Sequence, residues 1–565
     1  MSREVVRKRK KKRKLKVKRL VIVLIIFILL IVGLIKIISK TKDVLITNTY
    51  YMASNTNNVL LYSYDEENET LNDVDKIVRG SEVTSNDKIK VINDLEYLKI
   101  KYNDKEYYVL NDNVVKNKKD VVLEKEKYVR TSVTVYENNE DAKIESFIKK
   151  GNKLDILDYD KIDDNGFVNM YKIKIDDISG WVYSKYLVDT LEEAKEVYNE
   201  NGVYDTHKDR KYSRELYGGK ASSLDYYPYN KPNFNDNKLL EKANAIYLNG
   251  SVIKNVDTYI DLAKNTGINA MVVDIKDGDG VLAYDSNVAR EYSPTAYKNA
   301  INSFSDYQNA IKKIKDAGFY VIGRIVVFND SHYGKDHPED CIVSSSSSRL
   351  WPSAYSRGAW EYNVNLALEA AREMKFNEIQ FDYVRFPEDA YKMSTSGGTD
   401  FKNKYDEEKA EAIQNFLFYA ADQIHKANVY FSVDVFGECS NTYVTAYGQY
   451  WPAISNIVDV ISAMPYTDHF DNNPVRWNNP YQTMNNWGKT AAARQKEIPT
   501  PAIARTWITA YDTPHWNPTV VYDASKIADQ IRGLNDAGLN GGIMTWNVHS
   551  SVNKYNQIKS AFTND

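Results

Sequence analysis

The chain has 565 residues, which is more than one ordinary domain needs and enough for three or four. Hydrophobic residues make up 43% of it and charged residues 27%, so most of the chain can fold around hydrophobic cores. The two cysteines, Cys341 and Cys439, are too few for a disulfide scaffold or a cysteine-rich zinc site. The net charge of −3 hides an uneven distribution, because the first 40 residues hold 14 Lys and Arg against one acidic residue.

A basic segment and an apolar segment open the chain. Lys and Arg dominate residues 1–19, and residues 20–38 are apolar except for Gly33 and Lys36. At ~1.5 Å per residue, a helix of about 19 residues just crosses a hydrocarbon core of ~30 Å. We therefore expect a basic cytoplasmic tail over residues 1–19 and a transmembrane helix over residues 20–38. By the positive-inside rule the protein is then a single-pass protein of the cell membrane with an extracellular catalytic domain.

Two other interpretations of this opening segment are open. A cleaved signal peptide would have a shorter apolar region and an A-x-A-like cleavage site, and we find no such site. A basic arm for nucleic acid is the second alternative, but the adjoining apolar span favours an anionic lipid surface. We therefore expect a membrane partner and no nucleic-acid partner.

Two stretches with the pattern of small all-β domains follow the apolar segment. In residues 126–189, short alternating runs such as Tyr128–Tyr136 are separated by Gly, Asn and Asp, which predicts short strands and turns. The closing Gly180-Trp-Val182 and Tyr186-Leu187 resemble the hallmark of bacterial Src-homology-3-like (SH3-like) domains.

The earlier stretch, residues 45–117, is a degenerate copy of the same pattern. In it Tyr107-Tyr-Val-Leu110 stands where the second stretch has Gly-Trp-Val. SH3-like domains often bind cell-wall peptide or glycan, so the resemblance implies peptidoglycan as a partner. The alternative is that both domains are spacers.

A polar linker is expected over residues 190–237, and the last domain over residues 238–565. In the last domain short apolar runs alternate with helical patterns. The expected strands are Ala243–Leu248, Ala270–Ile275, Tyr320–Val327, Glu378–Val384, Tyr430–Phe436, Val458–Met464, Ala502–Thr506 and Gly542–Trp546. The expected helices include Val256–Asn265, Ser305–Ala317, Val364–Met374, Lys409–Ala427 and Ala524–Ala537. Eight strands that alternate with helices predict a (β/α)₈ TIM barrel.

Polar residues gather at the expected carboxyl ends of these strands, where TIM barrels have their active sites. Side chains alternate faces along a strand, so Asp382 and Asp434 face the barrel interior while their apolar neighbours face the helices. The residues near the strand ends are Asp274, Lys276, Arg324, Asp382, Arg385, Asp434, Glu438, Tyr466, His469, Arg505, Trp507, Trp546 and Asn547. The alternative is that the opposite charges neutralise one another in plain ion pairs, as Asp274 and Arg324 would.

One run on the fourth expected strand, Gln380-Phe-Asp-Tyr-Val-Arg-Phe-Pro387, resembles the signature of a family of predicted glycosyl hydrolases with a TIM barrel. Further matches are Val433-Asp-Val-Phe-Gly437 and Gly541-Gly-Ile-Met-Thr-Trp-Asn547, and the resemblance covers roughly residues 240–560. The resemblance implies hydrolysis of an O-glycosyl bond.

Glycosidases generally place two carboxyl groups on either side of the bond that they cleave. One carboxyl group donates a proton to the leaving oxygen, and the other is ionised and acts as nucleophile or base. We assign Asp382 as nucleophile or base, and Asp434 or Glu438, with Asp274 third, as the proton donor. Substrate contacts are expected from Lys276, Arg324, Arg385, Tyr466, His469, Arg505, Trp507, Trp546 and Asn547.

The leading hypothesis is a membrane-anchored extracellular glycoside hydrolase that cleaves a cell-wall or capsule polysaccharide. One alternative is a non-catalytic carbohydrate-binding or wall-organising protein. The other is a metal-dependent polysaccharide deacetylase, for which Asp330, His332, His337 and Asp340 are the candidate ligands. We find no Gly-rich phosphate loop, and we expect no cofactor and no catalytic metal.

Overall fold

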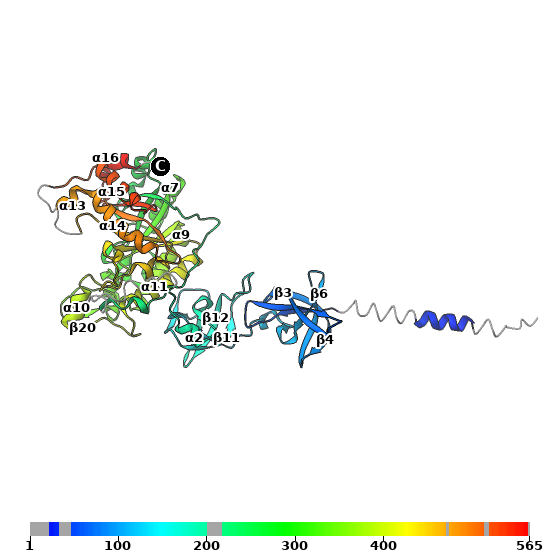
Figure 1. Ribbon diagram of the computed structural model, residues 1–565. Coiled ribbons are helices and arrows are strands. Elements are labelled where there is room, and N and C mark those ends of the chain that lie inside the picture. The colour runs from blue at the N-terminus through cyan, green and yellow to red at the C-terminus, as the bar shows by residue number, and fades with distance from the viewer. Residues whose placement is uncertain (1–21, 33–46, 200–216, 470–473, 514–518, 563–565) are drawn as a thin grey trace, which may run out of the picture. The chain divides into compact units, whose positions relative to one another are not determined.

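The structure, a computed structural model, describes residues 22–32, 47–199, 217–469, 474–513 and 519–562 (Figure 1). The chain divides into two compact units. One unit comprises Met1–Lys127, Asp155–Ile173 and Tyr183–Lys185, and the other comprises Tyr128–Leu154, Lys174–Val182 and Tyr186–Asp565. The parallel barrel lies wholly in the second of these units.

The first all-β region forms an antiparallel sheet of short strands. Apolar side chains such as Leu61, Ile77 and Ile100 are buried between more exposed neighbours, because successive residues of a strand point to opposite faces. The strands are β1 (Asn48–Met52), β2 (Asn58–Asp65), β3 (Thr70–Val78), β4 (Glu82–Ile92), β5 (Leu95–Tyr102), β6 (Lys105–Leu110) and β7 (Val114–Val115). Their order in the sheet is β3-β2-β6-β5-β4-β1-β7.

The second all-β region repeats this arrangement. Its strands are β8 (Glu126–Val129), β9 (Val133–Tyr136), β10 (Ile144–Ile148), β11 (Lys153–Tyr159), β12 (Met170–Ile175), β13 (Ile178–Tyr183) and β14 (Leu187–Val188). Their order is β10-β9-β13-β12-β11-β8-β14, which is the order of the first sheet with every strand number raised by seven. The two expected all-β regions are therefore present as repeats. Their resemblance to SH3-like domains, and peptidoglycan as their partner, stay predictions.

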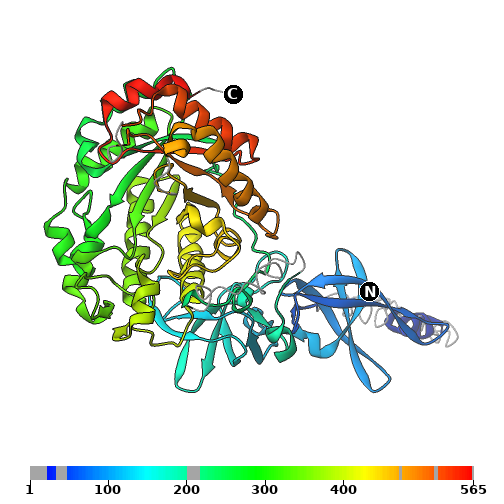
Figure 2. The same ribbon diagram turned by 60° about the vertical axis from the view of Figure 1, so that its left-hand side comes forward.

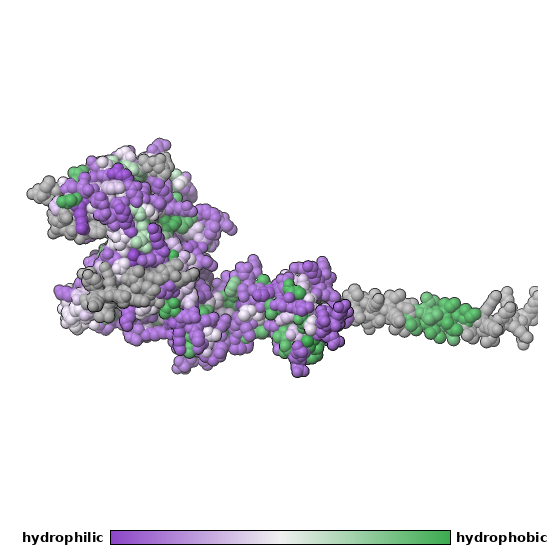
Figure 3. Space-filling model, viewed as in Figure 1, coloured by the Kyte–Doolittle hydropathy of each residue, from purple (hydrophilic) through white to green (hydrophobic). Residues whose placement is uncertain are grey.

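The expected transmembrane helix over residues 20–38 is not found. Residues 22–32 are helical and their apolar side chains are exposed (Figure 3). No helix among the described residues is long and apolar enough to cross a membrane. The predicted single-pass localisation rested on such a helix and is corrected with it. The basic tail over residues 1–19 and the rest of the expected span lie outside the described residues.

Nine parallel strand segments form the sheet of the barrel. They are β15 (Ala243–Leu248), β16 (Ala270–Lys276), β17 (Tyr320–Val326), β19 (Glu378–Asp382), β21 (Tyr430–Phe436), β22 (Val460–Met464), β23 (Ile503–Ala504), β24 (Thr506–Thr509) and β25 (Gly542–Trp546). Their order is β23-β22-β21-β19-β17-β16-β15-β25-β24. Only Arg505 separates β23 from β24, so both ends of the sheet belong to one stretch of chain and the barrel is nearly closed. This arrangement is consistent with a TIM-like barrel.

Helices cover the outside of the barrel (Figure 2). The helices that follow successive strands are α4 (Val256–Ala263), α7 (Phe304–Asp316), α9 (Arg357–Met374), α11 (Lys409–Lys426), α12 (Trp451–Ser455), α14 (Pro480–Gln495), α15 (Ala524–Asp536) and α16 (Val552–Ile558). Shorter elements are α2 (Leu191–Lys195), α5 (Asn287–Tyr292), α6 (Pro294–Lys298), α8 (Ser331–Asp336), β18 (Val343–Ser344), α10 (Ala390–Ser396), β20 (Thr399–Asp400) and α13 (Pro474–Asn478).

Burial on both faces explains the apolar strand sequences. Every residue of β15, β16 and β17 is buried, because one face packs against helices and the other fills the barrel interior. Parallel strands bring their carboxyl ends to one rim. Asp382 ends β19, Met464 ends β22 and Trp546 ends β25, so these side chains share that rim.

Candidate functional site

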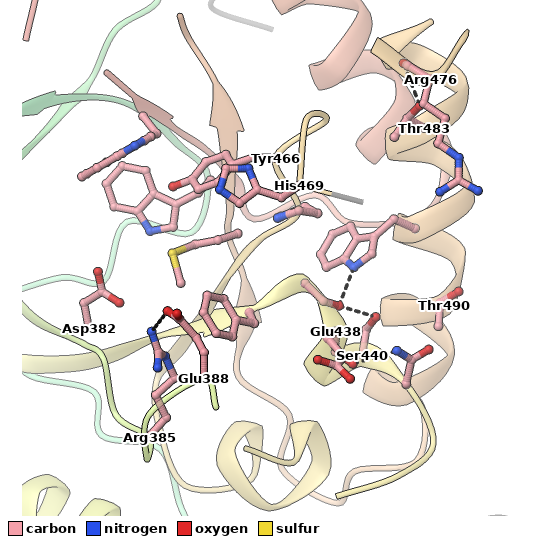
Figure 4. Close-up of a pocket in the computed structure, with 18 of the residues that line it drawn as sticks. Asp382, Arg385, Glu388, Glu438, Ser440, Tyr466, His469, Arg476, Thr483 and Thr490 are labelled. Atoms are coloured by element: carbon pink, nitrogen blue, oxygen red, sulfur yellow. Dashed lines mark hydrogen bonds and ion pairs between the residues drawn. The ribbon is translucent and has the colours of Figure 1, made fainter. Parts of the chain in front are cut away.

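A cavity of about 1210 Å³ opens at the rim formed by the carboxyl ends of the strands (Figure 4). Strand ends supply part of its lining, and α13 and α14 supply another part. Its lining includes Asp277, Arg324, Asp382, Tyr383, Arg385, Glu388, Phe436, Glu438, Tyr466, His469, Arg476, Trp487, Trp507 and Trp546. Small-molecule pockets usually measure ~300–1,000 Å³, so this cavity has room for an extended ligand.

Arg324 lies at the centre of the charged part of the site. Its guanidinium donates to Asp382 Oδ2 from Nε at 3.2 Å and from Nη2 at 2.7 Å. Nη1 donates to Asp274 Oδ1 at 2.7 Å and to Asp277 Oδ1 at 3.3 Å. Asp434 Oδ2 lies 4.0 Å from Nε. One buried cation therefore gathers carboxyl groups that the sequence carries on separate strands.

Asp382 lies where β19 stops. Besides the two bonds from Arg324, its carboxylate accepts the backbone N–H of Tyr383 on Oδ1 at 2.6 Å. Tyr383 has a φ of 53°, in the left-handed region that bulky side chains rarely adopt. Backbone strain of this kind is concentrated at functional sites. The strand therefore ends at Asp382, two residues before the expected end at Val384, and the turn holds the carboxylate at the cavity.

Asp434 lies on β21, is fully buried and, among the described residues, does not line the cavity. Its Oδ1 accepts the indole N–H of Trp507 at 2.8 Å, and its Oδ2 has no hydrogen-bond partner among the described residues. Burial raises the pKa of Asp434 well above its ordinary value, and the charge of Asp382 raises it further, while Arg324 and Trp507 oppose the shift. The protonated form of Asp434 is therefore favoured beside a carboxylate, Asp382, that is paired with a cation.

Asp274 is the third carboxyl group on Arg324 and is also buried. Its Oδ2 accepts the hydroxyl hydrogen of Tyr247, and its Oδ1 accepts from Arg324. Burial raises the pKa of Asp274 to about 7, although Arg324 opposes the shift. Among the described residues, Asp274 does not line the cavity. Its role is to hold the guanidinium of Arg324 in position through their hydrogen bond.

Glu438 reaches the cavity from the turn that follows β21. The hydroxyl of Tyr443 donates to its Oε1 at 2.7 Å, and the hydroxyl of Tyr447 donates to its Oε2 at 3.0 Å. These two bonds fix the orientation of the carboxyl group. Glu438 is thus the candidate proton donor that is directly accessible from the cavity.

Aromatic rings form a wall beside Asp382. The ring centre of Trp546 lies 5.8 Å from the ring centre of Trp507 and 6.4 Å from that of Tyr466. His469 continues this wall, with its ring 5.3 Å from Tyr466 and its Nδ1 2.9 Å from Asp468 Oδ1. Such faces can stack on the C–H faces of sugar rings.

Arg385 is held among aromatic rings on the opposite side. Its guanidinium carbon lies 4.5 Å from the ring centre of Tyr383 and 4.4 Å from that of Phe436. Its Nη2 donates to Glu388 Oε1 at 2.7 Å. Arg385 therefore neutralises Glu388, and Asp382 is paired with Arg324.

Three expected substrate contacts do not line the cavity among the described residues: Lys276, Arg505 and Asn547. The register between β16 and β17 shifts between Asp274 and Lys276, so Lys276 leaves the inward face that the alternation predicted. Its ammonium group instead donates to Asp330 and, at 2.8 Å, to Asn363.

Arg505 lies near the start of the seventh strand because that strand continues to Thr509, beyond the expected end at Thr506. It donates to both carboxylate oxygens of Glu378, the first residue of β19, at 3.0 Å. Asn547 binds the backbone, donating to Ala510 O at 2.8 Å and accepting from Ser551 N at 3.0 Å. Both side chains therefore have structural partners outside the cavity.

Several lining residues were missed by the sequence analysis. Asp277 and Glu388 follow strand ends by only a few residues, so their acidic character at that position was an available signal. The polar face of α14 was missed altogether. Its residues are separated by three or four positions, which a helical pattern could have revealed, but the helix there was not identified.

The side chains of the candidate metal cluster face different partners. Asp330 accepts from Lys276, and Asp340 accepts the hydroxyl of Tyr333 at 2.7 Å. His332 Nδ1 lies 3.0 Å from Gly280 O, and His337 Nε2 lies 2.7 Å from Tyr292 O. Within the described part of the chain, no group of three or more His, Cys, Asp or Glu side chains could hold a metal ion.

The fold and the site together define a TIM-like barrel with an acidic, aromatic-walled cavity at the active-site end. Residues 245–555 match the family model described as "Putative glycosyl hydrolase domain". The chain therefore belongs to this glycosyl hydrolase family. A comparison with curated proteins gave no match.

Solved structures similar to the chain include three bacterial proteins. A hypothetical protein from Ruminiclostridium thermocellum ATCC 27405 is 34% identical over 34% of this chain and 97% of its own, with a TM-score of 0.28. The PgaB (BpsB) glycoside hydrolase domain from Bordetella bronchiseptica is 13% identical over 57% of this chain and 99% of its own, with a TM-score of 0.42. The spore cortex-lytic enzyme SleL from Bacillus megaterium QM B1551 is 13% identical over 57% of this chain and 75% of its own, with a TM-score of 0.36.

Proposed function

We propose that the chain hydrolyses O-glycosyl bonds of a polysaccharide, with Asp382 as the nucleophile or base. One observation carries the proposal: Asp382 is paired with the guanidinium of Arg324, while the pKa of the neighbouring Asp434 is raised. A carboxyl group that is paired with a cation and a second one whose pKa is raised match the two roles, nucleophile or base and proton donor, that the hydrolysis of a glycosidic bond requires.

Asp434 is the proton donor in this proposal. Asp382 Oδ2 and Asp434 Oδ2 lie 3.2 and 4.0 Å from the same Nε of Arg324, so their separation cannot exceed those two distances together. That limit allows the ~5–5.5 Å of retaining enzymes and the shorter part of the ~6.5–9.5 Å range of inverting enzymes. The proton of Asp434 would pass to the leaving oxygen, and Asp382 would attack the anomeric carbon or deprotonate the attacking water. Glu438, which is exposed to the cavity, is the competing donor.

The aromatic wall and the size of the cavity support a sugar polymer as substrate. Trp546, Tyr466 and Trp507 offer apolar ring surface next to Asp382, and Arg324 brings hydrogen-bond donors to the same place. We propose that this polymer is a cell-wall or capsule polysaccharide, and the test substrates therefore include both classes.

The test is a glycan screen that scores released reducing ends. Wild type and Asp382→Asn are incubated with peptidoglycan, capsule polysaccharides and neutral plant and fungal glycans. We expect wild type to release reducing ends from at least one glycan and Asp382→Asn to release none. Asp512→Asn is the matched control, because Asp512 lies in the same unit, pairs with Lys554 at 2.7 Å and does not line the cavity.

Three outcomes would contradict parts of this proposal. Binding of a glycan without release of reducing ends would indicate a non-catalytic binding protein. Release of acetate that a chelator abolishes would indicate a deacetylase. Hydrolysis that survives Asp434→Asn but not Glu438→Gln would move the proton-donor role to Glu438.

A further inference from the structure

A row of polar side chains runs along the cavity on α13 and α14. Its members are Arg476, Asn479, Gln482, Thr483, Asn486 and Thr490, and all of them line the cavity. On α14, Gln482, Thr483 and Thr490 lie three or four positions from Asn486, so these four residues share one face of that helix. Arg476 belongs to α13, and Asn479 lies between the two helices. In Figure 4, Arg476, Thr483 and Thr490 lie on the far side of the cavity from Asp382.

Two amides in the middle of the row are pre-oriented. Gln482 Nε2 donates to Asn486 Oδ1 at 2.7 Å, across one turn of α14. Among the described residues, Gln482 Oε1 and Asn486 Nδ2 make no hydrogen bond, and both side chains are exposed. The pair therefore presents one acceptor and one donor in a fixed arrangement, which lowers the entropy cost of binding a ligand.

The helix that carries the row is fixed to the rim of the barrel. The indole N–H of Trp487 donates to the carbonyl oxygen of Gly437 at 2.9 Å, and Gly437 precedes Glu438 in the turn after β21. Met484 and Ala491 are buried on the opposite side of α14. A row on a rigid, anchored helix is positioned more accurately than one on a loop.

We propose that the α13–α14 row is an outer sugar-binding subsite, which binds units of a glycan chain beyond the unit attacked at Asp382. The inference rests on the proposed function and adds the substrate class. Apart from Arg476 the row consists of uncharged amides and hydroxyls, which match the hydroxyl groups of a neutral oligosaccharide. The chain therefore acts on oligosaccharides of several units in preference to disaccharides, because only longer chains extend from Asp382 to α14.

The test compares substrate lengths in the full chain. Neutral cello-, chito-, xylo- and manno-oligosaccharides of two to six units serve as probes. In the series that wild type cleaves, we expect kcat/KM to rise about 10-fold or more from the shortest cleaved member to the longest, since each hydrogen bond to the row adds affinity. The triple variant Gln482→Ala/Asn486→Ala/Thr490→Ala should abolish this rise and leave the shortest substrate unchanged. Alanine is the best helix former, so α14 should stay folded.

Lys489→Ala is the matched control, because Lys489 is exposed on α14 and does not line the cavity. A triple variant that keeps the length dependence, or that loses activity equally on all lengths, overturns the inference and leaves the proposed function intact. If wild type cleaves no probe, the affinity of the same series is measured by calorimetry. An affinity that rises with length and falls in the triple variant then supports the subsite, whereas no binding of any probe overturns it; the proposed hydrolysis is decided separately by the glycan screen.

Discussion

Two of the buried arginines of the barrel, Arg324 and Arg505, lie near opposite ends of it in different electrostatic settings. Arg324 lines the cavity and contacts the carboxyl groups of Asp274, Asp277 and Asp382. Arg505 lies between β23 and β24 at the other end, where both oxygens of Glu378 accept from it at 3.0 Å. Both guanidinium groups are almost completely buried, so burial alone does not distinguish the two ends of the barrel.

Charge balance does distinguish them. Arg505 meets one carboxylate, and the pair is neutral. Arg324 meets three carboxyl groups and has Asp434 at 4.0 Å, so negative groups outnumber it. Burial then favours protonation of the surplus carboxyl groups, which the raised pKa values of Asp274 and Asp434 express. The same residue type stabilises the barrel at one end and controls protonation at the other.

Replacing Arg324 with Lys should have the largest effect on activity. Lysine keeps one positive charge but cannot bridge Asp274 and Asp382 with a planar fork, so Asp382 loses its position. We expect kcat/KM on the glycan found in the screen to fall about 100-fold or more. Arg532→Lys, on the exposed side chain that pairs with Asp529, is the control. If Arg324→Lys turns over the glycan at the wild-type rate, the carboxyl groups held by Arg324 do not take part in the mechanism as proposed.

Glu378→Gln tests the other end of the barrel. It leaves the buried charge of Arg505 without a counter-ion, which should lower the free energy of unfolding by about 3–5 kcal/mol. Urea unfolding measures this loss, and kcat of the folded variant should match wild type. The double variant Glu378→Leu/Arg505→Met should recover most of the stability, since it removes both charges. If Glu378→Gln lowers kcat but leaves the free energy of unfolding unchanged, the pair of Arg505 and Glu378 does not serve stability alone, and the two ends of the barrel do not differ as proposed.

Asp274→Asn should change how stability depends on pH. The pKa of Asp274 is about 7 in the folded chain against an ordinary 3.8, so the unfolded chain releases this proton first. As pH rises from 3.8 towards 7, the folded state therefore loses stability relative to the unfolded state, and the loss levels off above that window.

Urea unfolding at about pH 4, 5.5 and 7 measures this dependence. The wild type should lose at least about 1 kcal/mol more than Asp274→Asn across the window. Asp512→Asn, which changes a half-buried carboxylate in the same unit, should keep the wild-type slope. Identical slopes in wild type and Asp274→Asn would mean that Asp274 is not protonated in the folded chain.

Trp507→Phe should have the smallest effect. It removes the indole N–H that donates to Asp434 and that holds the pKa of this carboxyl group down. The pKa of Asp434 should rise further, so the alkaline limb of the kcat/KM profile should move to higher pH by up to about one unit. Trp351→Phe is the control, because Trp351 is buried and lies outside the lining of this cavity. A shift to lower pH would exclude Asp434 as the proton donor.

The sequence predicted the barrel strands well because short buried runs lie between polar turns. The expected and observed bounds coincide for β15, β21 and β25. Alternation also predicted that Asp382 and Asp434 converge. It failed at Lys276, because a one-residue irregularity reverses the faces of a strand without leaving a pattern. Arg505, which was expected near the carboxyl end of its strand, lies near the start instead because the strand continues to Thr509.

The polar wall of the cavity and the first segment were harder to predict, for a common reason. A polar stripe on a helix has the same sequence pattern whether it faces water or a cavity, so the row on α14 could not be distinguished from a solvated face. An apolar run is compatible with a membrane span, yet no helix among the described residues is long and apolar enough to cross a membrane. Which surroundings a segment meets is decided by the fold around it.

The shared strand order of the two N-terminal sheets allows their residues to be compared position by position. Tyr136 pairs with Trp181 in the second sheet where Tyr62 pairs with Tyr108 in the first, so Gly180 and Tyr107 occupy equivalent positions. A Cβ at Gly180 would lie 2.5 Å from the carbonyl oxygen of Tyr136, so the second copy cannot accept the tyrosine of the first. The two sheets therefore share a strand order but differ in the side chain that this position can hold.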